Sequence, residues 1–135
     1  MTTMESHAMT TDAVFQPIAG GTSLSDDTAR PYDRRWLVVD EQDCWLAADQ
    51  APRLAELDLS LRFGYLVIRA AGMLRLDVPL DVIEDDDSVE RTARIGGQEV
   101  RVVDEGELAS AWFAEWLGQP CRLVKVHPEA GAVRW

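Results

Sequence analysis

Short apolar runs bounded by turn residues recur along most of this chain, and they restrict it to a fold built from many short strands. Segment 57–62 alternates leucine with polar residues, which is the pattern of a strand with one buried face. The dipeptide Gly96-Gly97 resembles the two-residue turn of a type I′ hairpin. The other expected strands are 13–18, 35–40, 44–47, 65–70, 74–78, 91–95, 98–103 and 121–126.

One segment, 107–117, has the period of a helix. Leu108, Trp112 and Trp116 fall in one row along it, and Ala109, Phe113 and Leu117 form the adjoining row, which predicts an inward-facing apolar stripe. Gly118 follows at the position where a left-handed residue commonly ends a helix. Many short strands and one late helix predict an α+β fold, an antiparallel β-barrel-like or strongly curled sheet of short strands with one main helix near the C-terminus.

The length of 135 residues suits one domain. Residues 1–12 are polar and aperiodic and are expected to form a disordered tail, 13–127 the β-barrel-like domain, and 128–135 a C-terminal tail. The formal net charge of −11 opposes binding to nucleic acid or to anionic membrane. The N-terminus has no basic and apolar signal segment, and the two cysteines lack disulfide or metal spacing, so we expect a cytoplasmic protein with reduced thiols.

The residues offer few candidates for chemistry. The acidic run 84–87 lacks the spacing of a calcium loop and is typical of a solvated loop. Cys44 lies beside Asp43, which disfavours a reactive thiolate, and His127 follows the last expected strand. No catalytic or metal-binding residues can be assigned. Trp135 is either a docking residue for a partner or simply the exposed end of the chain.

Several segments, taken together, resemble the N-terminal β-barrel domain of MOSC proteins, the molybdenum-cofactor sulfurase C-terminal family. That family includes the mitochondrial amidoxime-reducing component and its bacterial relatives. The resemblance runs from about 13 to 126. Its specific parts are Gln16-Pro17-Ile18, the YDRRWLVVD segment 32–40, Ala51-Pro52-Arg53-Leu54, and the block 104–126 with its Trp-Phe pair, its Leu-Gly-Gln-Pro and its Arg-Leu-Val.

The resemblance implies a domain that, together with a following MOSC domain, encloses a molybdenum cofactor. The metal-binding cysteine belongs to the MOSC domain, which would begin about where this chain ends. This half of the family site holds the pterin phosphate through a Lys-Ser pair and the first arginine of the DRRW-like segment. Here the pair is Ala19 and Gly20, and Arg34 is retained.

A second family segment keeps Gln50 but has Asp49 where the family has arginine. The resemblance therefore assigns Arg34, Gly20 and Gln50 to a weak remnant of a phosphate-binding corner. Lost charge-assisted contacts contribute about 1.5–3 kcal/mol each, so no cofactor is expected for this chain alone. From the residues themselves, 19–23 is either a phosphate-binding nest or a plain turn. Arg34 and Arg35 either clamp an anion, or one is solvated and the other pairs with a nearby carboxylate such as Asp33 or Asp40.

Two functions follow. The first is a stand-alone MOSC N-terminal-like domain that acts as a non-catalytic binding or accessory module. Its partner would be a MOSC-domain protein or another protein, and it would be monomeric and metal-free in isolation. The second is half of a molybdenum-cofactor-dependent oxidoreductase or sulfur-transfer enzyme, completed in trans by a MOSC domain. Catalysis by the chain alone is not expected.

Overall fold

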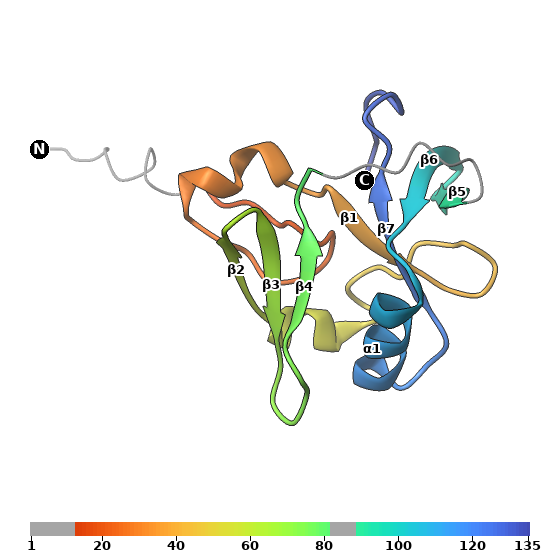
Figure 1. Cartoon of the computed structure of the whole chain (residues 1–135). Helices are drawn as coiled ribbons and strands as arrows, with labels where there is room; N and C mark the ends of the chain where they lie inside the picture. Colours follow the sequence, from red (N-terminus) through yellow and green to blue (C-terminus); the bar gives the residue numbers. More distant parts are fainter. Residues whose placement is uncertain (1–12, 82–88) are drawn as a thin grey trace, which may run out of the picture.

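A computed structural model describes residues 13–81 and 89–135, which form two antiparallel sheets and one helix (Figure 1). The larger sheet has the order β1-β7-β6-β5 and the smaller β2-β3-β4. Their bounds are β1 Trp36–Val39, β2 Asp58–Arg62, β3 Tyr65–Arg69, β4 Leu76–Pro79, β5 Glu90–Ile95, β6 Gln98–Asp104 and β7 Arg122–Val126. The helix α1 spans Glu107–Leu117, and the 3-10 helices are η2 Asp27–Tyr32 and η3 Pro52–Glu56. The expected α+β class with curled antiparallel sheets is confirmed.

Two expected strands are reduced to isolated bridges. Segment 13–18 makes one bridge between Phe15 and Leu24 and another between Ile18 and Trp36. Pro17 between them has no N–H to donate, so a continuous ladder cannot form through it. Segment 44–47 forms isolated β-bridges to chain segments on both of its sides, and in one of them Trp45 lies opposite Val39. The expectations for residues 1–12, which include His7, and for the acidic run 84–87 lie outside the described residues.

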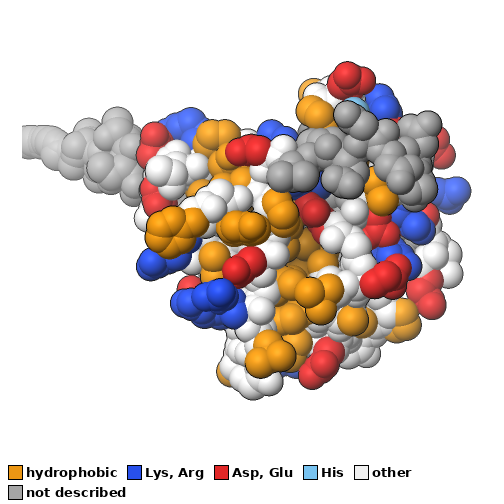
Figure 2. Space-filling model, viewed as in Figure 1, with side chains coloured by type: hydrophobic (Ala, Val, Ile, Leu, Met, Phe, Trp, Pro, Cys, Tyr) orange, Lys and Arg blue, Asp and Glu red, His pale blue; other side chains and the backbone are white. Residues whose placement is uncertain are grey.

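The main core lies between the two sheets and under α1. Trp36, Leu54, Leu66 and Phe113 are fully buried in it and come from β1, η3, β3 and α1. A second, smaller core cluster covers the opposite face of the larger sheet. All four residues of β1 are buried because β1 is covered on both faces, which explains its uninterrupted Trp-Leu-Val-Val sequence. Apolar side chains also reach the surface near the smaller sheet (Figure 2).

The helix has the expected bounds, and most of the expected apolar stripe is buried, but Leu108 at its start is not. Trp112, Phe113 and Trp116 are buried, whereas Leu108 is 78% exposed. The prediction that Leu108 faces inward is therefore wrong. With 3.6 residues per turn, Leu108 lies roughly 90° round the helix from the centre of the buried face. Gly118 ends the helix in the left-handed conformation, as expected.

The C-terminal residues pack on the domain. Trp135 meets Trp45 edge to face, with ring centroids 5.0 Å apart, and joins the second core cluster. Gln98 Nε2 donates to the Arg134 carbonyl at 2.8 Å, which fixes this segment to the β5–β6 hairpin. In this structure Trp135 is thus neither a free end nor an exposed docking residue. No helix in the described part of the chain is long and apolar enough to cross a membrane.

The type I′ geometry occurs at Phe63-Gly64 rather than at Gly96-Gly97. Phe63 and Gly64 both have positive φ, 52° and 83°, and Arg62 pairs with Tyr65 across them. In the other hairpin only Gly96 has positive φ, so the expectation of a type I′ turn there is wrong. Phe63 is an unusual residue for this position, because a side chain in the left-handed region costs about 1–2 kcal/mol.

Replacing Phe63 by asparagine should therefore raise the free energy of unfolding by about 1 kcal/mol. Asparagine tolerates positive φ and favours this turn, and Phe63 is 94% exposed, so little packing is lost. Urea titration of both proteins measures the difference. Phe63→Ala is the matched control, because it removes the ring and keeps the strained backbone. A loss of stability in Phe63→Asn would show that the ring makes contacts that support the fold.

Candidate functional site

The turn that contains Gly20 lies against the segment that contains Gln50. Gly20 has φ 87°, and a Cβ placed on it would stand 3.2 Å from the Ala48 backbone nitrogen. Its own N–H donates to Gln16 Oε1 at 3.0 Å. The turn interpretation of 19–23 describes this geometry, since Gly21 N–H closes back on the Ile18 carbonyl at 2.9 Å. The Gly20 N–H therefore already has an acceptor inside the chain.

Gln50 is exposed, and its side-chain amide oxygen accepts a hydrogen bond within the 47–50 turn. Gln50 Oε1 accepts the Ala47 backbone N–H at 3.0 Å, and the Gln50 N–H returns to the Ala47 carbonyl at 2.9 Å. The side chain thus caps the 47–50 turn. An anion at this corner would have to compete with the Ala47 N–H for the orientation of the Gln50 side chain.

Arg34 lies on the other side of the Ile18–Trp36 bridge from Gly20. Its backbone, at φ 53°, donates its N–H to the Gln16 carbonyl. The Arg34 guanidinium makes no hydrogen bond or ion pair with any described residue. It borders a hollow of about 250 Å³ whose other wall comes from 126–135, including His127 and Trp135. Gly20 and Gln50 do not line that hollow, so the structure places Gly20 beside the 47–50 turn and the Arg34 side chain at a separate hollow.

Neither arginine of the pair takes the carboxylate partners considered from the sequence. Arg35 Nη2 donates to the Pro31 carbonyl at 3.4 Å. Asp33 Oδ1 accepts the Gln16 N–H at 2.7 Å, and Asp40 Oδ1 accepts the N–H groups of 42 and 44. The two carboxylates hold loop backbone instead. This leaves Arg34 as a cation open to solvent beside the C-terminal segment.

Ala19 and Gly20 do not fit the part that a Lys-Ser pair would play in holding the pterin phosphate of a molybdenum cofactor. Ala19 is 1% exposed and belongs to the second core cluster, so a lysine there would place its charge among apolar side chains. A serine at Gly20 would be strained by the positive φ and crowded by Ala48. Changing Ala19 and Gly20 to the residue types of the family would thus disturb this fold rather than restore a phosphate site.

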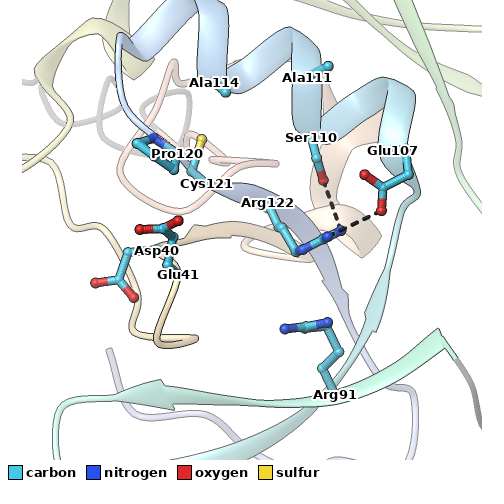
Figure 3. A pocket seen from close by; sticks show the side chains of 10 residues that line it. All are labelled: Asp40, Glu41, Arg91, Glu107, Ser110, Ala111, Ala114, Pro120, Cys121 and Arg122. Carbon is cyan, nitrogen blue, oxygen red and sulfur yellow. Dashed lines mark hydrogen bonds and ion pairs between the residues drawn. The ribbon is translucent and has the colours of Figure 1, made fainter.

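A second hollow, of about 420 Å³, lies between α1, β7 and the loop after β1 (Figure 3). Its cations are paired: Arg122 reaches Asp104 at 2.7 Å and Glu107 at 3.2 Å, and Arg91 reaches Asp43 at 3.0 Å. Figure 3 shows the Glu107 and Ser110 side chains directed at Arg122. The charges of these arginines are therefore largely compensated within the chain.

Cys121 also borders this hollow, and it is a poor nucleophile. Burial raises the pKa of the Cys121 thiol to about 11, so it is protonated at neutral pH. No cluster of three or more His, Cys, Asp or Glu residues that could bind a metal ion occurs in 13–81 or 89–135. The arrangement around Cys121 supports packing and ion pairing and supplies no activated group for chemistry.

Sequence reasoning missed a buried polar group that joins the two sheets. Lys125 of β7 is 1% exposed, and its Nζ donates to the carbonyls of Pro79 and Leu80 at 2.9 and 3.2 Å. Glu105 Oε2 lies 3.5 Å from the same Nζ and accepts the Trp36 indole N–H at 2.7 Å. Lysine is rarely buried, so residue type alone gives no signal for this role.

Comparison with known proteins identifies the domain. The family described as MOSC N-terminal beta barrel domain matches residues 19–120. The chain is 37% identical over 101 residues to a molybdenum cofactor sulfurase of Danio rerio and 33% identical over 104 residues to mitochondrial amidoxime-reducing component 1 of Xenopus laevis. These matches cover 73% and 76% of this chain, but only 12% and 29% of the two relatives.

A solved structure extends the similarity to most of the chain. A Bordetella bronchiseptica protein, known from its solution structure, is 54% identical to this chain and superposes on it with a TM-score of 0.78. The alignment covers 90% of this chain and 94% of the other. The overall arrangement of strands and helix is therefore shared with a protein of similar extent. The chain belongs to the MOSC N-terminal beta barrel domain family.

Proposed function

We propose that this chain is a stand-alone MOSC N-terminal-like domain that serves as a non-catalytic binding or accessory module for another protein, with a MOSC-domain chain as the first candidate. The main support for this proposal is that the donors of the phosphate-binding corner near Gly20 are already used within the chain. The N–H groups of Gly20 and Ala47 already donate to side-chain oxygens inside the chain, and Ala19 is buried. The chain alone then has few unoccupied donors for binding a phosphate, while the surface of the folded domain can still contact another protein.

The comparisons support a separate module. The Bordetella relative is matched over 94% of its chain, so a similar domain was solved by itself. The sulfurase and the amidoxime-reducing component contain the matching region within much longer chains. The proposal includes a monomer in isolation and a cytoplasmic location, in keeping with Cys44 and Cys121, which are both free thiols.

The test of a closed corner is an NMR titration with inorganic phosphate and with a pterin phosphate, following the Gly20 and Arg34 amides. Binding should be no tighter than about millimolar, since one arginine contributes only about 1.5–3 kcal/mol. Asp49→Arg adds a cation beside the corner and should tighten binding less than about tenfold, because the N–H groups remain occupied. Micromolar binding by the unaltered chain, with shifts at Gly20 and Arg34, would contradict the proposal.

The partner is tested separately by mixing this chain with a MOSC-domain chain from the same genome. Light scattering after gel filtration should show a one-to-one complex. The second candidate function is half of a molybdenum-cofactor enzyme completed in trans. It is favoured by the Arg34 guanidinium, which lies at the 250 Å³ hollow and has no partner within 13–81 and 89–135. Under that alternative the complex would contain stoichiometric molybdenum, and Arg34→Ala would lower its molybdenum content. Under the accessory role Arg34→Ala leaves the metal content unchanged.

A further inference from the structure

The outer face of the smaller sheet carries an exposed basic and aromatic surface, here called the basic face: Arg62, Phe63, Tyr65, Arg69 and Arg75. Alternation along β3 turns Leu66 and Ile68 into the core and places their neighbours on this outer side. These residues surround a shallow hollow of about 320 Å³ with Val67 at its floor. Figure 2 shows blue and orange side chains lying together over β2–β4.

The charge of this face is opposite to that of the chain as a whole. The net charge of the chain is −11, yet the residues that line this hollow include three arginines and one acidic residue, Asp77. Arg75 Nε pairs with Asp77 Oδ1 at 3.1 Å. Asp58 stands opposite Arg69 in the strand register, but they form no ion pair. The guanidiniums of Arg62 and Arg69 have no hydrogen-bond or ion-pair partner among the described residues, so both can bind carboxylates from outside.

The exposed aromatic residue is a second and independent observation. Phe63 is 94% exposed at a position of positive φ, where asparagine would suit the turn better. Tyr65, directly across the turn from Arg62, is 43% exposed. An exposed phenylalanine that adds strain and little packing is unfavourable for folding. Strain of this kind is characteristic of residues kept for contact with a ligand or partner.

We infer that the basic face binds an acidic segment of a partner protein. Carboxylates of that segment pair with Arg62 and Arg69, and one apolar side chain packs between Phe63 and Tyr65. Charge complementarity favours this occupant. Two guanidiniums that are unpaired in the described part of the chain match a short acidic segment, whereas the acidic remainder of the surface repels a long phosphate backbone. The inference rests on the binding-module role proposed above and adds to it the surface and the chemistry of the partner.

The first experiment uses a blocked pentapeptide with four acidic residues around a central phenylalanine as the probe. An NMR titration at low ionic strength should give saturable shifts confined to amides of β2–β4. The double substitution Arg62→Glu with Arg69→Glu should weaken binding by about tenfold or more. Phe63→Asn should weaken binding as well while leaving the protein folded, so its loss of binding cannot come from unfolding.

Arg94→Glu is the matched control. Arg94 is exposed on β5 of the other sheet and also lacks a side-chain partner among the described residues. The Arg94→Glu substitution changes the net charge in the same direction as each arginine substitution on the basic face. It should change the affinity for the peptide by less than about twofold. Equal weakening by Arg94→Glu, shifts spread over the whole surface, or no saturable shift would overturn the inference. Tighter binding of a single-stranded oligonucleotide than of the peptide, with shifts at the same amides, would contradict the inference that the occupant is a protein segment.

The complex with a MOSC-domain chain separates this inference from the proposed function. If the Arg62→Glu, Arg69→Glu variant binds neither the peptide nor the partner chain, the inference about the basic face and the proposed function are both supported. If it still binds the partner chain normally, the basic face is not the docking surface, and the module role remains. If the unaltered protein binds the peptide but no MOSC-domain chain, the partner class proposed above is wrong and the basic face stands.

Discussion

Replacing Lys125 by methionine should destabilise the protein by about 3–5 kcal/mol, because it leaves the Glu105 carboxylate buried without its cation. Glu105 Oε2 lies 3.5 Å from Lys125 Nζ and is otherwise held by the Trp36 indole N–H. The Pro79 and Leu80 carbonyls also lose the donor that connects the smaller sheet to β7. Urea titration followed by tryptophan fluorescence measures the change, and a loss below about 1 kcal/mol would contradict it.

The double variant Lys125→Met with Glu105→Gln is the control. Burial raises the pKa of Glu105 and lowers the pKa of Lys125, so each charged form is less favoured in the folded protein than in water. Removing both charges removes both desolvation costs, and the glutamine oxygen still accepts the Trp36 N–H. The double variant should therefore recover about half or more of the loss seen in Lys125→Met. No recovery would mean that the aliphatic stem of Lys125 and its carbonyl contacts dominate.

Replacing Trp112 by alanine should cost about 3–5 kcal/mol, enough to unfold a domain of ordinary stability. Trp112 is 7% exposed and packs against Phe113 and Trp116, with ring centroids 5.0 and 6.4 Å away. Its indole N–H donates to the Leu74 carbonyl at 2.6 Å, which ties α1 to the loop before β4. Alanine removes the ring from the main core and leaves a cavity beside these two aromatic side chains.

Leu108→Ala is the matched control for Trp112→Ala, since it shortens an apolar side chain one turn earlier on the same helix. Leu108 is 78% exposed, so its loss should change the free energy of unfolding by less than about 0.5 kcal/mol. Urea titrations of the two variants compare the two faces of α1 directly. A cost for Leu108→Ala as large as that for Trp112→Ala would mean that the helix packs through the face that carries Leu108.

The sequence predicted the candidate site less well than the fold. Arg34, Gly20 and Gln50 were grouped because the family places them around one phosphate. In the structure Gly20 lies beside the 47–50 turn, whereas Arg34 lies across the Ile18–Trp36 bridge at a hollow formed with 126–135. Spacing along the chain could not show that the N–H groups of Gly20 and Ala47, which could otherwise meet an anion, donate to Gln16 Oε1 and Gln50 Oε1.

The basic face was missed for a related reason. Arg62, Arg69 and Arg75 are six or seven residues apart and separated by mostly apolar residues, so no charge run marks them. They meet because β2, β3 and β4 pair in a register that puts Arg62 opposite Tyr65 and Val67 opposite Asp77. Pairing register is a property of the assembled sheet, so the three charges gather on one face only after folding.

By itself the sequence determined most of the short strands, the single α-helix and its C-terminal end. Those features depend on local period and on turn residues, as in the alternation of 57–62 and the stop at Gly118. The tertiary structure alone decided that Leu108 lies outside the buried face of α1, where Trp135 packs, and that Lys125 is enclosed. Each of these depends on which distant segment covers a given face. Lys125 becomes buried only because the end of β4 lies over β7 and offers its carbonyls to the ammonium group.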